Sequence, residues 1–143
     1  VLRGDAWTGG IDARHRFGRN RFQVSAQLAG SRVSGTAAAI ARTQRSNVHL
    51  FQRVDATHIT LDSSRTSLTG ALTQVSLDKQ GGGITRFNLS GWYVAPGFEI
   101  NDVGFRTRSD EMGGAAWMGI RPTKPFGSFR RGGLNFNAYA VSW

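Results

Sequence analysis

Apolar and polar residues alternate over the fourteen residues from Arg21 to Ser34. The apolar positions are Phe22, Val24, Ala26, Leu28 and Gly30. Strict alternation predicts a β-strand whose two faces meet different surroundings. Strands of soluble proteins usually have about 5–6 residues, whereas this one would extend about 45 Å at about 3.3 Å per residue. Tilted by about 40°, it would rise about 35 Å, enough to cross the hydrocarbon layer of a bilayer.

Alternation predicts five further strands, at 7–17, 66–79, 84–95, 114–121 and 130–143. In 66–79 the two faces are hard to assign, because Leu68, Leu72 and Val75 do not share a side. A helix is expected over 36–45, with Thr36 as its N-cap. The chain is thus expected to be one unit, 1–143, with these parts: a hairpin (7–34), a long connection with a short helix (35–65), two strands (66–95), a charged loop (96–113) and a second hairpin (114–143).

The predicted connections alternate between short and long, which is the pattern of outer-membrane β-barrels. Aromatic residues gather near the expected strand ends, as in the girdles of such barrels. They are Trp7, Phe17, Phe22, Trp92, Tyr93, Phe126, Phe129 and Trp143. Single-chain barrels begin at about 8 strands, so six strands are expected to belong to a larger barrel or to be completed by further copies. The abrupt ends of the chain favour a segment of something longer.

In such a barrel the alternate positions of each strand face lipid or the lumen. The lipid-facing candidates are Phe22, Val24, Leu28, Phe87, Leu89, Leu134 and Phe136. The lumen-facing candidates are Asp12, Arg14, Arg16, Gln23, Gln27, Arg86, Asn88, Asn135 and Asn137. The lumen arginines would favour anionic solutes or, the preferred reading, pair with carboxylates such as Asp12. Arg32 continues the apolar row and is therefore expected at or beyond the outer interface.

Composition supports an all-β protein, since 19 of the 143 residues are glycine and only 19% are charged. The chain has no cysteine, which excludes a disulfide framework and a thiolate metal site. Its longest aliphatic run, 37–41, is far shorter than the about 20 residues of a membrane helix. The first five residues contain no apolar segment typical of a secretory signal.

The net charge of +9 comes from sixteen arginines and two lysines. Such a balance can indicate a polyanionic partner, but these arginines are scattered along the chain and do not favour nucleic acid. Arg130 and Arg131, beside a predicted short turn, would lie at a membrane interface near lipid phosphates.

Four of the nine acidic residues lie within the thirteen residues from Glu99 to Glu111. The segment lacks the spacing of a calcium loop, so no metal is expected there. Ion pairs within the loop are expected instead, with the candidates Glu99, Asp102, Arg106, Arg108 and Asp110.

The three histidines, His15, His49 and His58, lack the spacing of metal ligands. His58, Asp62 and Ser63 include the residue types of a hydrolase triad, but no nucleophile motif surrounds them. We therefore expect no catalysis, metal or cofactor.

Three stretches carry a resemblance: RFQVSAQLAGSRVSG (21–35), AIARTQRSNVHLFQR (39–53) and APGFEINDVGFRTRSDE (95–111). They resemble the C-terminal region of domain-of-unknown-function family 5916 of Gram-negative envelope proteins, and 96–105 is the most specific part. The resemblance implies a predicted outer-membrane β-barrel, which in the family follows a secreted, carbohydrate-binding-like domain. Family members are much longer, this chain lacks that domain, and the family supplies no established reaction.

The sequence therefore predicts an antiparallel up-and-down meander of about six long strands, forming part of a transmembrane β-barrel. The expected role is that of a non-catalytic structural or transport component of the bacterial outer membrane. Its expected partners are outer-membrane lipid, the remaining strands or further copies, and envelope proteins. The alternative is a soluble β-sandwich that binds glycans or polyanions through Trp and Arg side chains, with the apolar strand faces packed into one core.

Overall fold

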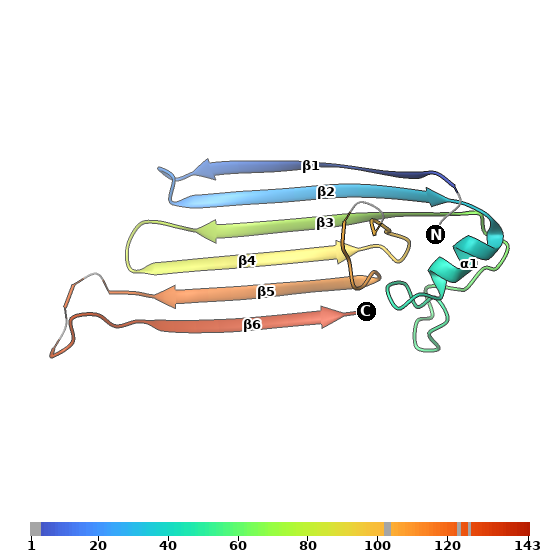
Figure 1. The fold of residues 1–143 in the computed structure, drawn as a ribbon. Helices are drawn as coiled ribbons and strands as arrows, with labels where there is room; N and C mark the ends of the chain where they lie inside the picture. Colours follow the sequence, from blue (N-terminus) through green and yellow to red (C-terminus); the bar gives the residue numbers. More distant parts are fainter. Residues whose placement is uncertain (1–3, 102–103, 123, 126) are drawn as a thin grey trace.

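The structure is a computed structural model that describes residues 4–101, 104–122, 124–125 and 127–143. Six antiparallel strands form one sheet in chain order (Figure 1). The strands are β1 (Ala6–Phe17), β2 (Phe22–Ser34), β3 (Ser67–Lys79), β4 (Thr85–Val94), β5 (Glu111–Ile120) and β6 (Leu134–Ser142). One helix, α1 (Ala37–Gln44), lies between β2 and β3. The predicted all-β meander is confirmed.

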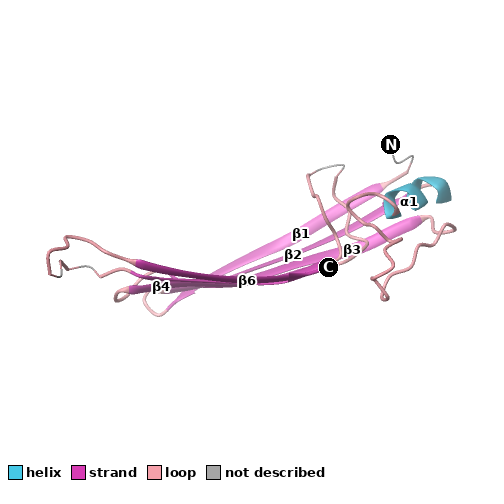
Figure 2. Cartoon of the chain, turned by 90° about the horizontal axis from the view of Figure 1, so that it is seen from below, coloured by secondary structure: helices cyan, strands magenta, loops and turns pink. Residues whose placement is uncertain are grey.

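The sheet is a single twisted layer, as the view along its edge shows (Figure 2). The β1–β2, β3–β4 and β5–β6 connections lie at one end, here called the turn end, and the two long connections, β2–β3 and β4–β5, lie at the other, the loop end (Figure 1). The β5–β6 connection, 121–133, is longer than the turn expected over 122–129. The first short connection contains Gly18, Arg19 and Asn20, all with positive φ. Glycine and asparagine tolerate this left-handed backbone best, which explains the tight reversal from β1 to β2.

The two long sides of the sheet are formed by β1 and β6, each of which pairs with one neighbour in the described chain. Neighbouring strands do not end in the same row of pairs, so the outline of the sheet is slanted. At the loop end, β1 reaches the row of Ala6, Val33 and Leu68. Strand β4 ends four residues earlier along β3, where Val94 pairs with Leu72. At the turn end, β5 and β6 extend beyond the row that starts β2. Staggered strands of this kind are a feature of sheets that close into barrels.

Helix α1 begins at the predicted N-cap. The Thr36 hydroxyl oxygen accepts a hydrogen bond from the backbone N–H of Ala39 over 3.2 Å, which satisfies one free donor of the first turn. The helix buries Ile40 in a small core against three other apolar residues. These are Val33, Phe51 and Leu68. The long connection from β2 to β3 is therefore packed onto the end of the strands that it joins.

Two strand starts differ from the sequence-based expectation by more than one residue. Strand β5 begins at Glu111, three residues before the predicted start at 114, because Glu111 pairs with Val94 and continues the ladder. Strand β6 begins at Leu134, four residues after the predicted start at 130, because the last pair at the turn end joins Leu134 to Ile120.

Candidate functional site: a two-faced sheet with a capped end

One face of the sheet is apolar. Residues paired directly across an antiparallel ladder point to the same face, so the register assigns every strand residue to a face. Of thirteen exposed large hydrophobic residues in the strands, twelve lie on one face, here called the apolar face. They are Trp7, Ile11, Phe17, Val24, Leu28, Val75, Leu89, Tyr93, Met112, Met118, Leu134 and Phe136. All seven lipid-facing candidates of the sequence analysis are on this face.

Charged and aromatic side chains on the apolar face lie toward its two ends. Lys79 is at the turn end and Arg32 is third from the loop end of β2, paired with Trp7 and Thr69. One row at the turn end crosses the whole sheet and holds Phe17, Phe22, Lys79, Phe87, Met118 and Phe136. Phe17 and Phe22 stack with their ring centroids 5.4 Å apart. The centre of the face carries small and aliphatic residues.

The opposite face, here called the polar face, carries all nine lumen-facing candidates of the sequence analysis. Over β1, β2 and β3 it is hollowed by a shallow polar cavity of about 120 Å³. The polar side chains around it are Asp12, Arg14, Ser25, Gln27, Gln74 and Ser76.

The hydrogen bonds of the polar face differ from the expected wall of arginine–carboxylate pairs. Arg16 Nε donates to the Gln23 amide oxygen over 2.9 Å, and Arg86 donates to the backbone carbonyl oxygens of Gly83 and Thr85. Asp78 accepts from the Asn88 amide over 2.8 Å. Within the described strands, Arg16 and Arg86 thus donate to amide and carbonyl oxygens, where carboxylate partners were expected.

The two long connections cover the polar face at the loop end. Val33, Leu68 and Val94 are on the polar face, yet each is at most 2% exposed because the connections lie over them. The backbone of the second connection touches the sheet, since a Cβ added to Gly70 would lie 2.2 Å from the backbone nitrogen of Phe98. These covered apolar positions explain why the faces of β3 were hard to assign from sequence.

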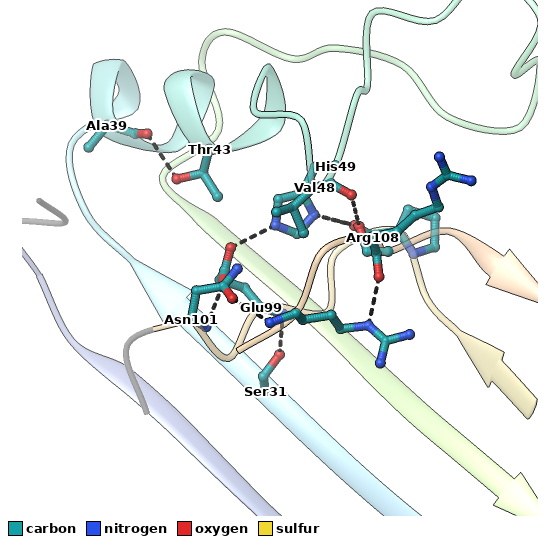
Figure 3. Close-up of polar contacts among 11 residues, drawn as sticks. Ser31, Ala39, Thr43, Val48, His49, Glu99, Asn101 and Arg108 are labelled. Atoms are coloured by element: carbon teal, nitrogen blue, oxygen red, sulfur yellow. Dashed lines mark hydrogen bonds and ion pairs between the residues drawn. The ribbon is translucent and has the colours of Figure 1, made fainter. Parts of the chain in front are cut away.

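A buried polar network joins the two connections (Figure 3). His49 comes from the first connection and is 1% exposed. Its Nε2 lies 2.8 Å from Oε2 of Glu99, and its Nδ1 lies 2.7 Å from the Pro96 carbonyl oxygen. Glu99 is tied to the sheet as well, because its backbone N–H donates to the Ser31 hydroxyl over 2.8 Å. One histidine therefore links both connections and, through Glu99, strand β2.

Hydrogen bonds around His49 and Glu99 set the direction of the Glu99 pKa. A carbonyl oxygen only accepts hydrogen bonds, so Nδ1 of His49 carries a proton. Burial raises the pKa of Glu99, but hydrogen bonds from His49 and the Asn101 N–H, together with the positive charge of His49, outweigh it and leave that pKa below its ordinary value. Glu99 is therefore a carboxylate, and His49 Nε2 contacts it over 2.8 Å inside the joined connections.

Ser109, His49 and Glu99 lie in the same order as the serine, histidine and carboxylate of a hydrolase triad. Its Oγ lies 2.8 Å from His49 Nδ1, but it also lies 3.0 Å from the carbonyl oxygens of Val48 and Pro96, to which it donates. Ser109 is 2% exposed, so its hydroxyl faces protein and not solvent. A nucleophile needs access to a substrate carbon and a free base as proton acceptor. This geometry instead holds three segments of the connections together.

A second ion-pair cluster lies beside the first. Asp110, which is 7% exposed and has a φ of 56°, accepts from Arg53 over 2.5 Å and contacts Nε2 of His58 over 2.8 Å. The next residue, Glu111, accepts from the indole N–H of Trp92 over 2.5 Å. The second connection is thus anchored to the first connection and to β4 where it enters β5.

The loop acids expected to pair with neighbouring arginines have other partners. Glu99 pairs with His49, and Asp110 pairs with Arg53 and His58. Arg106 donates to the Arg108 carbonyl oxygen, and the Arg108 guanidinium lies 4.5 Å above the ring of Trp143. Asp102 and Phe126 lie outside the described residues.

His58 and Asp62, which with Ser63 have the residue types of a hydrolase triad, bond to other residues in the structure. His58 contacts Asp110, while the Asp62 carboxylate accepts from the backbone N–H and hydroxyl of Ser64. These hydrogen bonds from Ser64 lower the pKa of Asp62. In the described part of the chain, no group of three or more His, Asp or Glu side chains is placed to hold a metal ion.

Sequence reasoning missed His49 and Ser109 as members of a network. The two residues are 60 positions apart, and neither belongs to a spaced motif. The only signal in the sequence is the pair of long polar connections that leave the sheet at the same end, which predicts contact between them without naming the residues.

Fold and site together define a class of protein: an antiparallel meander with one apolar face and one polar face, capped at one end by its long connections. A helix long and apolar enough to cross a membrane is not found among the described residues. The chain belongs to the family described as domain of unknown function DUF5916, whose family model matches residues 20–142. No curated protein and no solved structure matches the chain significantly.

Proposed function

We propose that this chain forms part of the wall of an outer-membrane β-barrel and serves as a structural or transport component of a Gram-negative envelope. The observation that carries the proposal is the apolar face, on which twelve large hydrophobic side chains are exposed together. Soluble monomers rarely expose a continuous apolar surface of this extent. Lipid is the occupant that such a face fits best.

The dimensions of the apolar face support lipid as its partner. Ten residues without charge, 22–31, separate Arg21 from Arg32 along β2. At about 3.3 Å per residue and a tilt of about 40°, this stretch rises about 25 Å, which matches the apolar band of membrane barrels. The aromatic row at the turn end and Trp7 at the loop end correspond in position to interfacial girdles.

In the proposed barrel the polar face lines the lumen, and the two long connections cover its outer end. The alternative, a soluble β-sandwich, requires a second layer over the apolar face. Within the described chain the apolar residues of β2, β4 and β6 share one face, but no segment of the chain packs over that face to form a core.

Fluorescence quenching tests the proposal, because the chain has no cysteine and single cysteines can be labelled anywhere. A nitrobenzoxadiazole probe is attached at Leu28→Cys or Leu89→Cys on the apolar face, with Gln27→Cys and Asn88→Cys as matched neighbours on the polar face. In vesicles that contain brominated acyl chains, the first pair should be quenched and the second pair should not. Equal fluorescence at all four positions, from protein that stays monodisperse without detergent, would favour the soluble alternative.

A further inference from the structure

Two tryptophans of the polar face lie over glycines of strand β5. A Cβ added to Gly113 would lie 2.4 Å from the Trp92 indole, and a Cβ added to Gly119 would lie 2.9 Å from the Trp117 indole. Each ring therefore occupies space that a side chain on β5 would otherwise fill. Both tryptophans are half-buried. Glycine at these two positions leaves the space that each indole occupies.

The indole of Trp92 is also fixed at its edge, because its N–H donates to the Glu111 carboxylate over 2.5 Å. A ring held on one face and at one edge loses little freedom when a ligand stacks on it. Tyr139 on β6 adds a third aromatic side chain on the polar face and is 83% exposed. Its partner Ala115 is two residues from Trp117.

The aromatic residues form a path across the sheet. Trp117 pairs with Asn88, four residues along β4 from Trp92, so the two tryptophan positions are about 14 Å apart. Trp92 in turn pairs with Gln74, which borders the polar cavity over β1, β2 and β3. The path therefore leads from Tyr139 and Trp117, past Trp92, into a hollow rich in amides, hydroxyls and charged groups.

The charges along the polar face select among ligands that could use such a path. Its strand residues include three arginines and three acids, whose formal charges cancel, and Arg121 beside Trp117 adds one positive charge. The strand residues are Arg14, Arg16, Arg86, Asp12, Asp78 and Glu111. A polyanion or a nucleic acid would need an excess of positive charge here. A neutral ligand with many hydrogen-bonding groups fits the face better.

We propose that the indoles of Trp92 and Trp117, with Tyr139, form a stacking path for a neutral oligosaccharide on the polar face. A pyranose ring has apolar C–H faces and a rim of hydroxyl groups. Its faces can bury against an indole, whose electron-rich surface attracts C–H groups. Amides and ions such as Asn88, Asp78 and Gln74 supply partners for the rim.

Arg121 contributes a further donor at this path. Its guanidinium lies 5.9 Å from the ring centroid of Trp117, and the side chain is exposed. It can thus move aside for a sugar ring and donate to hydroxyl oxygens at the rim of that ring. The inference names a solute class for the proposed barrel, and it rests on the proposed function only in taking the polar face as water-filled.

Calorimetry on the purified full-length protein in detergent tests the inference with maltohexaose, cellohexaose and chitohexaose. At least one of these sugars should bind to the wild type, and the Trp92→Ala/Trp117→Ala variant should bind it at least about tenfold more weakly, as for removal of stacking platforms. Trp7→Ala, on the apolar face, is the matched control and should bind like the wild type. Gly113→Ala should weaken binding while keeping every aromatic side chain, because its methyl group lifts the Trp92 indole off the sheet.

Each outcome bears on the inference. Failure of all three sugars to bind at millimolar concentration, or equal affinity in the double variant and the wild type, overturns it. Stronger binding of polyphosphate than of any sugar, lost in the same variant, also overturns it in favour of a polyanion. Bromolipid quenching of the same preparations reports on the proposed barrel separately, since it depends only on the apolar face. Intact quenching without sugar binding therefore refutes the sugar path alone.

Discussion

The hydroxyl oxygen of Ser109 lies 2.8 Å from Nδ1 of His49, across a separation of 60 residues in the sequence. Together with the His49–Glu99 ion pair, this contact makes one buried imidazole the junction of both long connections. Buried ion pairs contribute little net stability compared with apolar packing, but the loss of one partner leaves a buried charge without compensation. The junction is therefore most sensitive to the removal of a single residue.

His49→Ala should lower the free energy of unfolding by about 3–5 kcal/mol, because it leaves the Glu99 carboxylate buried and unpaired. His58→Ala is the matched control: its side chain is 57% exposed, so the loss of its pair with Asp110 should cost at most about 1 kcal/mol. Urea unfolding measures both values. Equal effects of the two substitutions would contradict the role of His49 as the junction.

The connections should loosen in acid. The pKa of Glu99 is lower in the folded protein than its ordinary value of 4.5, so its ionisation stabilises the fold above that pH. This stabilisation is lost as the pH falls through the lowered pKa of the folded state. The protection factors of the amides of 97–101, taken relative to the intrinsic exchange rate at each pH, should therefore fall as the pH drops below 4.5. In Glu99→Gln, protection should already be lower at neutral pH and should change less with acid.

Gly70→Ala should destabilise the protein by about 1–3 kcal/mol through overpacking, because the new methyl group meets the backbone of Gly97 and Phe98. Gly30→Ala offers a control on β2, since the nearest atom to its added Cβ is 4.0 Å away. That substitution should be neutral. Limited proteolysis between residues 96 and 110 should increase only in Gly70→Ala, and protection of this segment in both variants would refute the close contact.

Val75→Arg should show whether the apolar face contacts lipid or water. Val75 lies in the centre of the face and is 47% exposed in the isolated chain. In lipid the substitution should cost about 2–4 kcal/mol, whereas on a water-exposed face it should stay within about 0.5 kcal/mol. Gln74→Arg, its neighbour on the polar face, should be nearly neutral. Folding into vesicles, followed by urea titration, measures both, and a neutral Val75→Arg would contradict the lipid contact.

Thr36→Ala should destabilise α1 by about 1 kcal/mol, because the backbone N–H of Ala39 loses its acceptor. Thr36→Ser keeps the hydroxyl and should lose much less. The exchange rates of the first amides of α1 report the difference directly, and identical rates in both variants would show that the cap contributes nothing.

Alternation of apolar and polar residues was sufficient to predict the six strands, because each strand has two different environments and the period of side chains in a strand is two. The prediction was weakest where that condition fails. Leu68 is on the polar face but is covered by α1 and the first connection, so the end of β3 has apolar residues on both sides. Glu111 was expected in the charged loop, whereas it pairs with Val94 and begins β5.

The partners within the loops could not be predicted from sequence. Local spacing suggested that Glu99 would pair with nearby arginines, but the fold brings His49 to it from 50 residues away. Such contacts depend on how both connections fold over the same end of the sheet. That arrangement follows from the packing of Val33, Ile40, Phe51 and Leu68, and the short apolar segments that form this core carry no clear period.

The slanted outline of the sheet has a geometric consequence. Along the loop end, β1 extends to the row of Leu68 while β6 ends in the row of Thr73, a displacement of five residues over five neighbouring strands. At about 3.3 Å per residue and about 4.8 Å between strands, a level rim would need the strands to lean by about 35°. If further strands continued the sheet into a barrel from either edge, they would have the same tilt. Each added strand would then be shifted by about one residue relative to its neighbour.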